Sequence, residues 1–300
     1  MIRVVRTPAE PPELASVRQE QLQKLRSLKR PPEKDEIAGY RVVAPHLWRM
    51  QDYKCCYCEQ KLTLSFQDVE HFRPKTRADR APGCPETHGY WWLAFTWQNL
   101  LFACALCNRT HKRDRFPLKI GSTALCAEED APGQEARWLL DPAEDNGVEH
   151  IVFLPWSQRV PLPKDAGPRI SPDQIDGWRA LARNGSQEGD WSILVYGLND
   201  PQHQELYLDH VRDQVLPYVK QMRDAIAKSD RKRVKECFQE AGKRLLTRSV
   251  PYVGLSYDAL RYFVPDREIA RFRVRWPPPS EVGQPPRATA GAAPPAGAAR

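Results

Sequence analysis

The sequence contains no run of apolar residues long enough to cross a bilayer as a helix, which takes roughly twenty residues. Its first residues, MIRVVRTPAEPPEL, also lack the apolar segment that a secretory signal needs. We therefore expect a cytoplasmic protein with no membrane-bound part. A glycine-rich phosphate loop of the GxxxxGKS kind is absent too, so we expect that the chain does not hydrolyse ATP by that route.

The composition is that of a globular protein with many loops. The 300 residues include 28 prolines and 9 tryptophans, which predicts a real core and an irregular surface. The formal net charge is +7, and a positive excess suits a polyanionic partner such as nucleic acid. Charge alone does not establish such a partner.

Four of the eight cysteines form two Cys-x-x-Cys pairs, Cys55 with Cys58 and Cys104 with Cys107. Two such pairs can close a tetrahedral, structural zinc site, and 45 residues lie between them, enough for a functional insertion. A redox dithiol is the alternative, but it needs a thioredoxin-like strand and helix that the neighbouring sequence does not provide. The other cysteines are interpreted as small apolar residues: Cys56, Cys84, Cys126 and Cys237.

Apolar periodicity divides the chain into four regions. Residues 1–52 form an N-terminal helical region, with helices expected at 13–30 and 35–52. Residues 53–118 hold most of the cysteines and aromatic residues. Residues 119–276 are first rich in loops, with short strands at 137–140 and 150–154, and then helical at 201–227 and 229–247. The Pro/Ala/Gly-rich residues 277–300 are expected to be disordered.

Several motifs inside and beside the cysteine pairs carry chemistry. Glu70-His71 is followed by Pro74, then by Asn99, and Asn108 comes directly after Cys107. With these motifs the sequence resembles the HNH endonucleases whose core is held by two Cys-x-x-Cys pairs. The ordered series CxYCE, VEHFRPK, WQNLLFACALCN, FPL, LLDP and YGLN is similar to the HNH subunit of Septu and retron-associated anti-phage defence systems.

The resemblance implies a fold and a set of roles. The fold would be α+β and mostly helical, with a ββα-metal (HNH, treble-clef-like) core, a four-cysteine zinc knuckle and flanking helices. The hairpin strands are expected at 61–67 and 69–75. His71 would be the general base, Glu70 and Asn108 would hold a catalytic Mg²⁺ or Mn²⁺, and Asn99 would tie the loop that orients His71.

Two further ligands stay open at this point. Asp68 is a candidate extra ligand, although on a strand it shares a face with Glu70 while His71 points to the other face. His111 is a candidate replacement for the Asn108 amide.

Contacts with phosphate are expected from four basic residues that flank the site, although a solvated surface role is equally compatible: Arg73, Lys75, Arg109 and Lys112. The aromatic residues from Tyr90 to Trp97 could stack on bases, but we interpret them as core.

Together these features predict a divalent-metal-dependent HNH endonuclease that hydrolyses nucleic acid. As the effector of an anti-phage system, it would act with an ATPase partner. The alternatives are a non-catalytic zinc-knuckle protein that binds nucleic acid or serves as an adaptor, and a redox-sensing protein.

Overall fold

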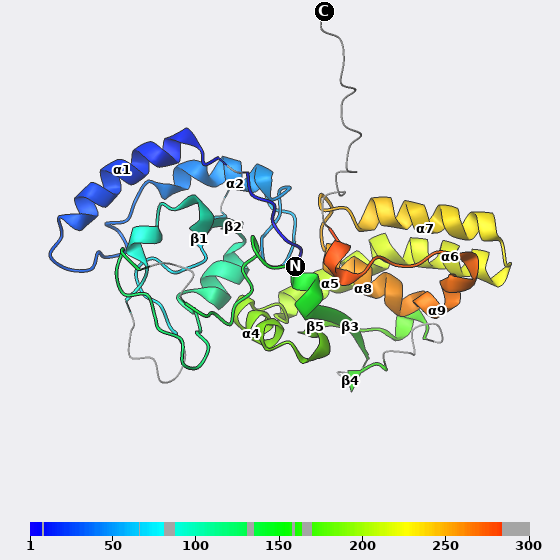
Figure 1. Cartoon of the computed structure of the whole chain (residues 1–300). Coiled ribbons are helices and arrows are strands. Elements are labelled where there is room, and N and C mark those ends of the chain that lie inside the picture. Colours follow the sequence, from blue (N-terminus) through cyan, green and yellow to red (C-terminus); the bar gives the residue numbers. More distant parts are fainter. Residues whose placement is uncertain are drawn as a thin grey trace, which may run out of the picture.

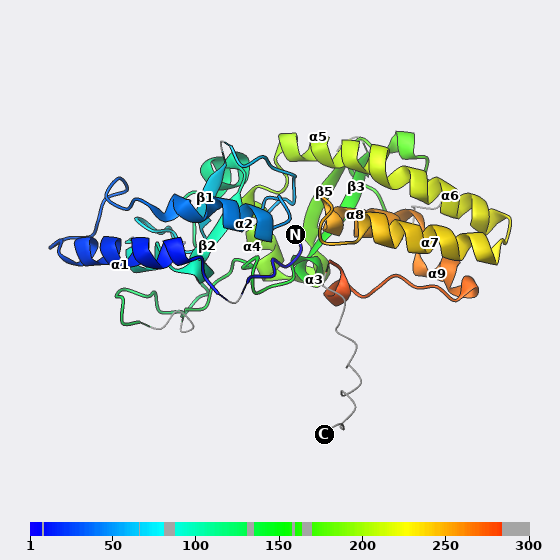
Figure 2. The same ribbon diagram turned by 90° about the horizontal axis from the view of Figure 1, so that it is seen from above.

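The computed structural model describes residues 1–7, 9–65, 67–80, 88–130, 135–157, 160–163 and 170–283. Figures 1 and 2 show an elongated molecule. Helices α1 (Pro12–Arg26) and α2 (Ala44–Met50) lie beside a small sheet at one end, and the long helices of the C-terminal region lie at the other. The structure confirms an α+β fold in which helices predominate over strands.

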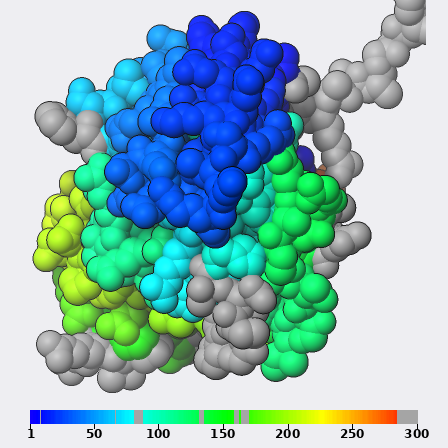
Figure 3. All heavy atoms as spheres, turned by 90° about the vertical axis from the view of Figure 1, so that its left-hand side faces the viewer, coloured from blue at the N-terminus to red at the C-terminus, as the bar shows by residue number. Residues whose placement is uncertain are grey.

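The N-terminal helices cover a core of their own. α1 starts with a proline, which suits the first helical position, and buries Leu14, Leu22 and Leu25 on one side. The helix expected at 35–52 is shorter and consists of a 3₁₀ turn at Tyr40–Val43 followed by α2. In Figure 3, which views this end of the molecule, the N-terminal segment (blue) forms the upper surface above the segments that follow it.

The small sheet consists of β1 (Asp68–His71) and β2 (Leu100–Ala103), which pair antiparallel with Asp68 opposite Ala103 and His71 opposite Leu100. We predicted that a strand at 61–67 pairs with a strand at 69–75. That pairing is wrong, because β1 pairs with β2 instead. Of the first strand, Lys61 makes an isolated bridge with Lys54, and residue 66 lies outside the described part. All four residues of LLFA are buried, and this continuous apolar run is the partner strand of β1.

The middle of the molecule holds a three-stranded antiparallel sheet in the order β4 (Val160–Pro161), β3 (Ile151–Ser157) and β5 (Gly177–Ala182). A one-turn helix, α3 (Gly147–His150), precedes it. The strand expected at 150–154 is confirmed, whereas residues 137–140 form only a bridge between Arg137 and Leu118. Helices α4 (Gln187–Tyr196) and α8 (Val253–Phe263) pack on this sheet.

The C-terminal region is helical as expected. The helix expected at 201–227 is present as α5 (Pro201–His210), a wide turn at Val211–Val215, and α6 (Leu216–Ala227). α7 (Arg231–Leu245) runs beside α6 and matches the helix expected at 229–247 (Figures 1 and 2). Two short elements, α9 (Asp266–Ile269) and a 3₁₀ turn at Ala270–Phe272, follow α8.

The predicted start of the disordered tail, residue 277, is too early in the sequence. Residues 279–281 form a 3₁₀ turn and Val282 is buried. Residues 284–300 lie outside the described part. None of the helices in the described ranges combines the length and apolar character that a membrane crossing requires.

Candidate metal centre and catalytic cleft

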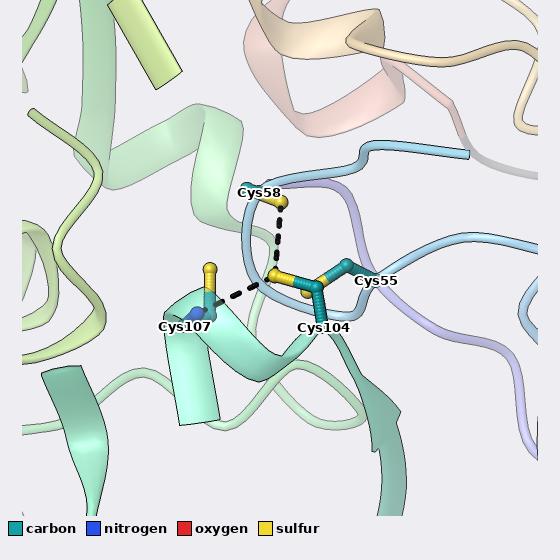
Figure 4. A group of neighbouring side chains, drawn as sticks. All are labelled: Cys55, Cys58, Cys104 and Cys107. Carbon is teal, nitrogen blue, oxygen red and sulfur yellow. Dashed lines mark hydrogen bonds between the residues drawn. The ribbon is translucent and has the colours of Figure 1, made fainter. Parts of the chain in front are cut away.

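The two cysteine pairs meet in one buried cluster. Cys55 and Cys58 lie on a tight turn after α2, while Cys104 follows β2 and Cys107 lies in a wide helical segment, η4 (Leu106–Lys112). Figure 4 shows the four side chains gathered around one point. Their sulfur atoms all lie within 4.8 Å of one another, and Cys58 Sγ is 3.9 Å from Cys104 Sγ. Sulfur atoms at the corners of a zinc tetrahedron have this kind of spacing, since each lies about 2.3 Å from the ion.

The chemistry of the cluster also favours a bound dication. Burial raises the pKa of the Cys58 and Cys107 thiols well above the ordinary value. Burial acts in the same sense on Cys55, but hydrogen bonds from the neighbouring thiols, Cys104 first, outweigh it and lower the pKa of Cys55. Four thiols in this environment would not all ionise without a compensating positive charge. The donor set therefore fits zinc, with each pair supplying two thiolates.

A cleft of about 610 Å³ lies close to this centre. Strand β1 contributes all four of its residues to the wall, and η4 contributes Asn108 and Arg109. The cleft therefore brings together Asp68, Glu70, His71 and Asn108, which the sequence places up to 40 residues apart.

His71 is held as a neutral imidazole with a defined tautomer. Its Nε2 lies 3.0 Å from the carbonyl oxygen of Ala94, and a carbonyl only accepts, so Nε2 carries the proton and Nδ1 is the free basic nitrogen. Burial, reinforced by the charge of Lys75, lowers the pKa of His71 to about 3. The ring also meets the edge of Tyr40, with the centroids 4.6 Å apart. The imidazole is thus unprotonated at neutral pH, with a lone pair on Nδ1.

Glu70 is buried and already engaged. Its Oε1 accepts a hydrogen bond from the Tyr57 hydroxyl at 3.0 Å and lies 2.7 Å from Lys112 Nζ. Burial raises the pKa of Glu70, and the ammonium of Lys112 opposes that rise. Lys112 also donates to the carbonyl oxygen of His71 at 3.0 Å, so one ammonium connects the carboxylate to the strand that carries the imidazole.

Asp68 and Asn108 are hydrogen-bonded to each other in the wall of the cleft. Asn108 Nδ2 donates to Asp68 Oδ2 at 3.1 Å, and Arg109 forms a bidentate pair with the same carboxylate at 2.6 and 2.8 Å. Oxygen atoms from a carboxylate and an amide are the ligands that Mg²⁺ and Mn²⁺ prefer. In this arrangement the Arg109 guanidinium balances the charge of Asp68.

Asn99 connects two backbone segments that follow His71 in the sequence. Its Oδ1 accepts from the Arg73 amide at 2.7 Å, and its Nδ2 donates to the carbonyl oxygens of Arg73 and Leu93, each at 3.1 Å. Leu93 immediately precedes Ala94, whose carbonyl orients His71. The Asn99 amide therefore ties the loop after β1 to the backbone that fixes the imidazole.

Three residues expected at the site occupy other positions. His111 Nε2 lies 2.9 Å from Asp200 Oδ2 and the ring does not line the cleft, so the structure does not bring His111 to the candidate ligands. Arg73 pairs with the buried Glu135 at 3.1 Å and is also absent from the cleft wall. Lys112 is fully buried and pairs with Glu70, so it offers no surface for phosphate.

Lys75 and Arg109 do line the cleft, as expected for phosphate contacts. The wall also contains Lys34, Tyr40 and Arg41 from the N-terminal region, which the sequence interpretation had assigned to a separate helical region. No local signal in the sequence reports that the segment before α2 folds over β1.

The aromatic segment is mostly core, as interpreted, since Tyr90, Trp92, Phe95 and Trp97 are buried and the half-buried Trp91 packs against them. Cys56 and Cys237 are buried as small apolar residues, Cys126 is exposed, and Cys84 lies outside the described residues. His203, to which the sequence interpretation gave no role, lies with its Nε2 3.3 Å from Cys107 Sγ.

The fold and the cysteine centre define an α+β protein built around a buried four-cysteine site that can hold zinc. The chain is similar to Septu protein PtuB of Bacillus mycoides (strain KBAB4), with 36% identity over 155 residues. The matched stretch is 51% of this chain and 45% of PtuB, so it spans less than half of that protein. This supports a PtuB-like relationship and confirms the resemblance to Septu proteins. No protein-family model and no solved structure matched the chain.

Proposed function

We propose that this protein is a divalent-metal-dependent HNH endonuclease that cleaves nucleic acid as the effector of an anti-phage defence system. The observation that carries the proposal is the cleft, where a neutral imidazole with a free Nδ1 lies beside two carboxylates and an amide. The similarity to Septu protein PtuB supports the defence role. An ATPase partner is part of the proposal, because the subunits that the motifs resemble work beside one.

In the proposed reaction, His71 Nδ1 accepts the proton of the water that attacks the phosphodiester. Asp68, Glu70 and Asn108 would hold Mg²⁺ or Mn²⁺, which when bound offers a Lewis acid for the phosphate and the departing oxygen. The Ala94 carbonyl holds the His71 ring in the required tautomer, and Asn99 donates to the carbonyl of the preceding residue, Leu93, which holds this stretch of backbone in place.

Basic side chains around the cleft suit a phosphate backbone. Lys34, Arg41, Lys75 and Arg113 line it together with Arg109. The Arg109 side chain is 61% exposed, so it can turn from Asp68 to a phosphate oxygen and release the carboxylate. We propose residues 53–118 as the nuclease core, residues 1–52 as its cover, and residues 119–276 as the region that supports both.

One observation favours a second candidate, a zinc-knuckle protein that binds nucleic acid without cutting it. Both acidic candidate metal ligands already have cationic partners, Lys112 for Glu70 and Arg109 for Asp68. In such a protein these pairs would be permanent, and the basic rim would bind phosphate alone.

The two candidates are separated by incubating the full chain with single-stranded DNA, duplex DNA and RNA, in Mg²⁺ or Mn²⁺, with and without its neighbouring ATPase. The nuclease proposal expects cleavage that is lost in His71→Ala and Asn108→Ala while the zinc content stays at one per chain. Arg233→Ala is the matched control, since Arg233 is basic and half exposed on α7, outside the cleft. Tight binding without cleavage under every condition would contradict the nuclease proposal and favour the second candidate.

A further inference from the structure

Residues 197–203, which comprise the segment between α4 and α5 and the first three residues of α5, contact the helical segment that carries Cys107 and Asn108. We call these residues the α4–α5 junction. Gly197 has a φ of +66° and lies so close to the His111 ring that a Cβ there would collide with it. Asp200 caps α5 by accepting from the Gln202 amide, and its other carboxylate oxygen contacts His111 Nε2 at 2.9 Å.

His203 extends the same contact to the cysteine centre. Its side chain is fully buried, and its Nε2 lies 3.3 Å from Cys107 Sγ. The ring stacks on Tyr207 with an interplanar angle of 13°. Among the described residues, His203 Nδ1 has no hydrogen-bond partner, so the bond to sulfur is the polar contact that holds the imidazole in place.

The chemistry of a zinc-bound thiolate decides the direction of this bond. A thiolate sulfur carries no proton and only accepts, so Nε2 must be the protonated nitrogen of His203. Four thiolates around one Zn²⁺ leave two excess negative charges in a buried site, which N–H donors to sulfur offset in part. The Cys107 amide, 3.4 Å from Cys104 Sγ, is one such donor, and the His203 imidazole is the side-chain donor.

We propose that the α4–α5 junction is a clamp on η4, in which His203 is a positioning residue that donates a hydrogen bond to the Cys107 thiolate. The bond stabilises the zinc centre from outside its ligand set. It also fixes the segment in which Asn108 directly follows Cys107, so the C-terminal helical region determines where the wall of the cleft lies. The clamp requires zinc in the cysteine centre and does not depend on nuclease activity.

The test compares three variants of the full chain loaded with zinc. His203→Phe keeps an aromatic ring against Tyr207 but removes the donor, whereas His203→Gln places an amide N–H near the position of Nε2. Tyr207→Phe is the control, because the Tyr207 hydroxyl has no hydrogen-bond partner among the described residues. The readouts are the rate of zinc release to a chromogenic chelator and the thiolate-to-cobalt absorption band of the Co²⁺-substituted protein.

We expect His203→Phe to release zinc about tenfold faster and to shift the cobalt band, as loss of an outer-shell partner does at other metal sites. His203→Gln should restore most of the wild-type behaviour, and Tyr207→Phe should match the wild type. Equal release rates and spectra for His203→Phe and the wild type would overturn the proposal. A Gln variant as impaired as the Phe variant would also overturn it, because packing and not the donor would then matter.

A measurement on the wild type covers the case in which His203→Phe does not fold. The ¹⁵N spectrum of the zinc-loaded chain labelled at histidine reports which ring nitrogen of His203 is protonated. The proposal expects the Nε2–H form, and the Nδ1–H form would refute it.

Discussion

The ion pair between Glu70 and Lys112 is the most sensitive element of the candidate site, and double substitution tests it. The charged groups are 2.7 Å apart and their side chains are 4% and 0% exposed. At an effective dielectric constant of about 20, their attraction is about 6 kcal/mol before desolvation is subtracted. Removing one partner leaves the other charge buried, so Lys112→Met and Glu70→Gln should each lower the free energy of unfolding by about 3–5 kcal/mol.

The double variant should lose less free energy of unfolding than the sum of the two single losses, by about 2 kcal/mol or more, because no unpaired charge remains. Urea denaturation of the zinc-loaded chain measures all four species. The surface pair of Arg137 and Glu144 is the control, since Glu144 is 71% exposed and Glu144→Gln should cost less than about 1 kcal/mol. Effects of Glu70→Gln and Lys112→Met that add to within about 0.5 kcal/mol would refute the reasoning.

Three further predictions concern other parts of the molecule. Burial lowers the pKa of His210 to about 4, whereas the pKa in the unfolded chain is about 6.5. The stability that neutral His210 provides is therefore complete above pH 6.5 and is lost as the pH falls toward 4. The loss in the free energy of unfolding is at most about 3 kcal/mol. The unfolding free energy of His210→Gln should therefore vary less over that range, and an unchanged pH dependence would contradict the assignment. Asn99→Ala removes three hydrogen bonds and should cost about 2–4 kcal/mol by thermal denaturation, against less than about 0.5 kcal/mol for the exposed Gln98→Ala. Cys107→Ser should lower the zinc content below one ion per chain, whereas Cys126→Ser, at an exposed cysteine, should keep one ion per chain. Equal zinc contents in the two variants would exclude the four-cysteine site.

Local spacing was sufficient to predict part of the fold and of the site. The two Cys-x-x-Cys pairs converge, since two thiols on one tight turn can bind only one edge of a metal ion and a second pair must complete the site. The long C-terminal helices follow from apolar residues on one face, as in α7, where Val234, Cys237, Ala241 and Leu245 are buried.

Contacts between distant segments could not be predicted in the same way. The partner of β1 was placed in the adjacent segment, although the true partner begins at Leu100, because strand pairing depends on burial that no local pattern records. Lys112 was expected on the surface, yet Glu70 draws its ammonium inward. Tyr40 and His203 contact the site only after chain segments far apart in the sequence have packed together.

Chemical rescue of His71 is the measurement that tests the proposed nuclease most directly. His71→Gly leaves a cavity beside the cleft, and added imidazole can occupy it and accept the proton. We predict that His71→Gly with full zinc content loses metal-dependent cleavage and that imidazole restores part of it, while Asn108→Ala gains nothing from imidazole. Cleavage by His71→Gly at the wild-type rate, without imidazole, would show that the reaction does not use this histidine and would contradict the proposed active site.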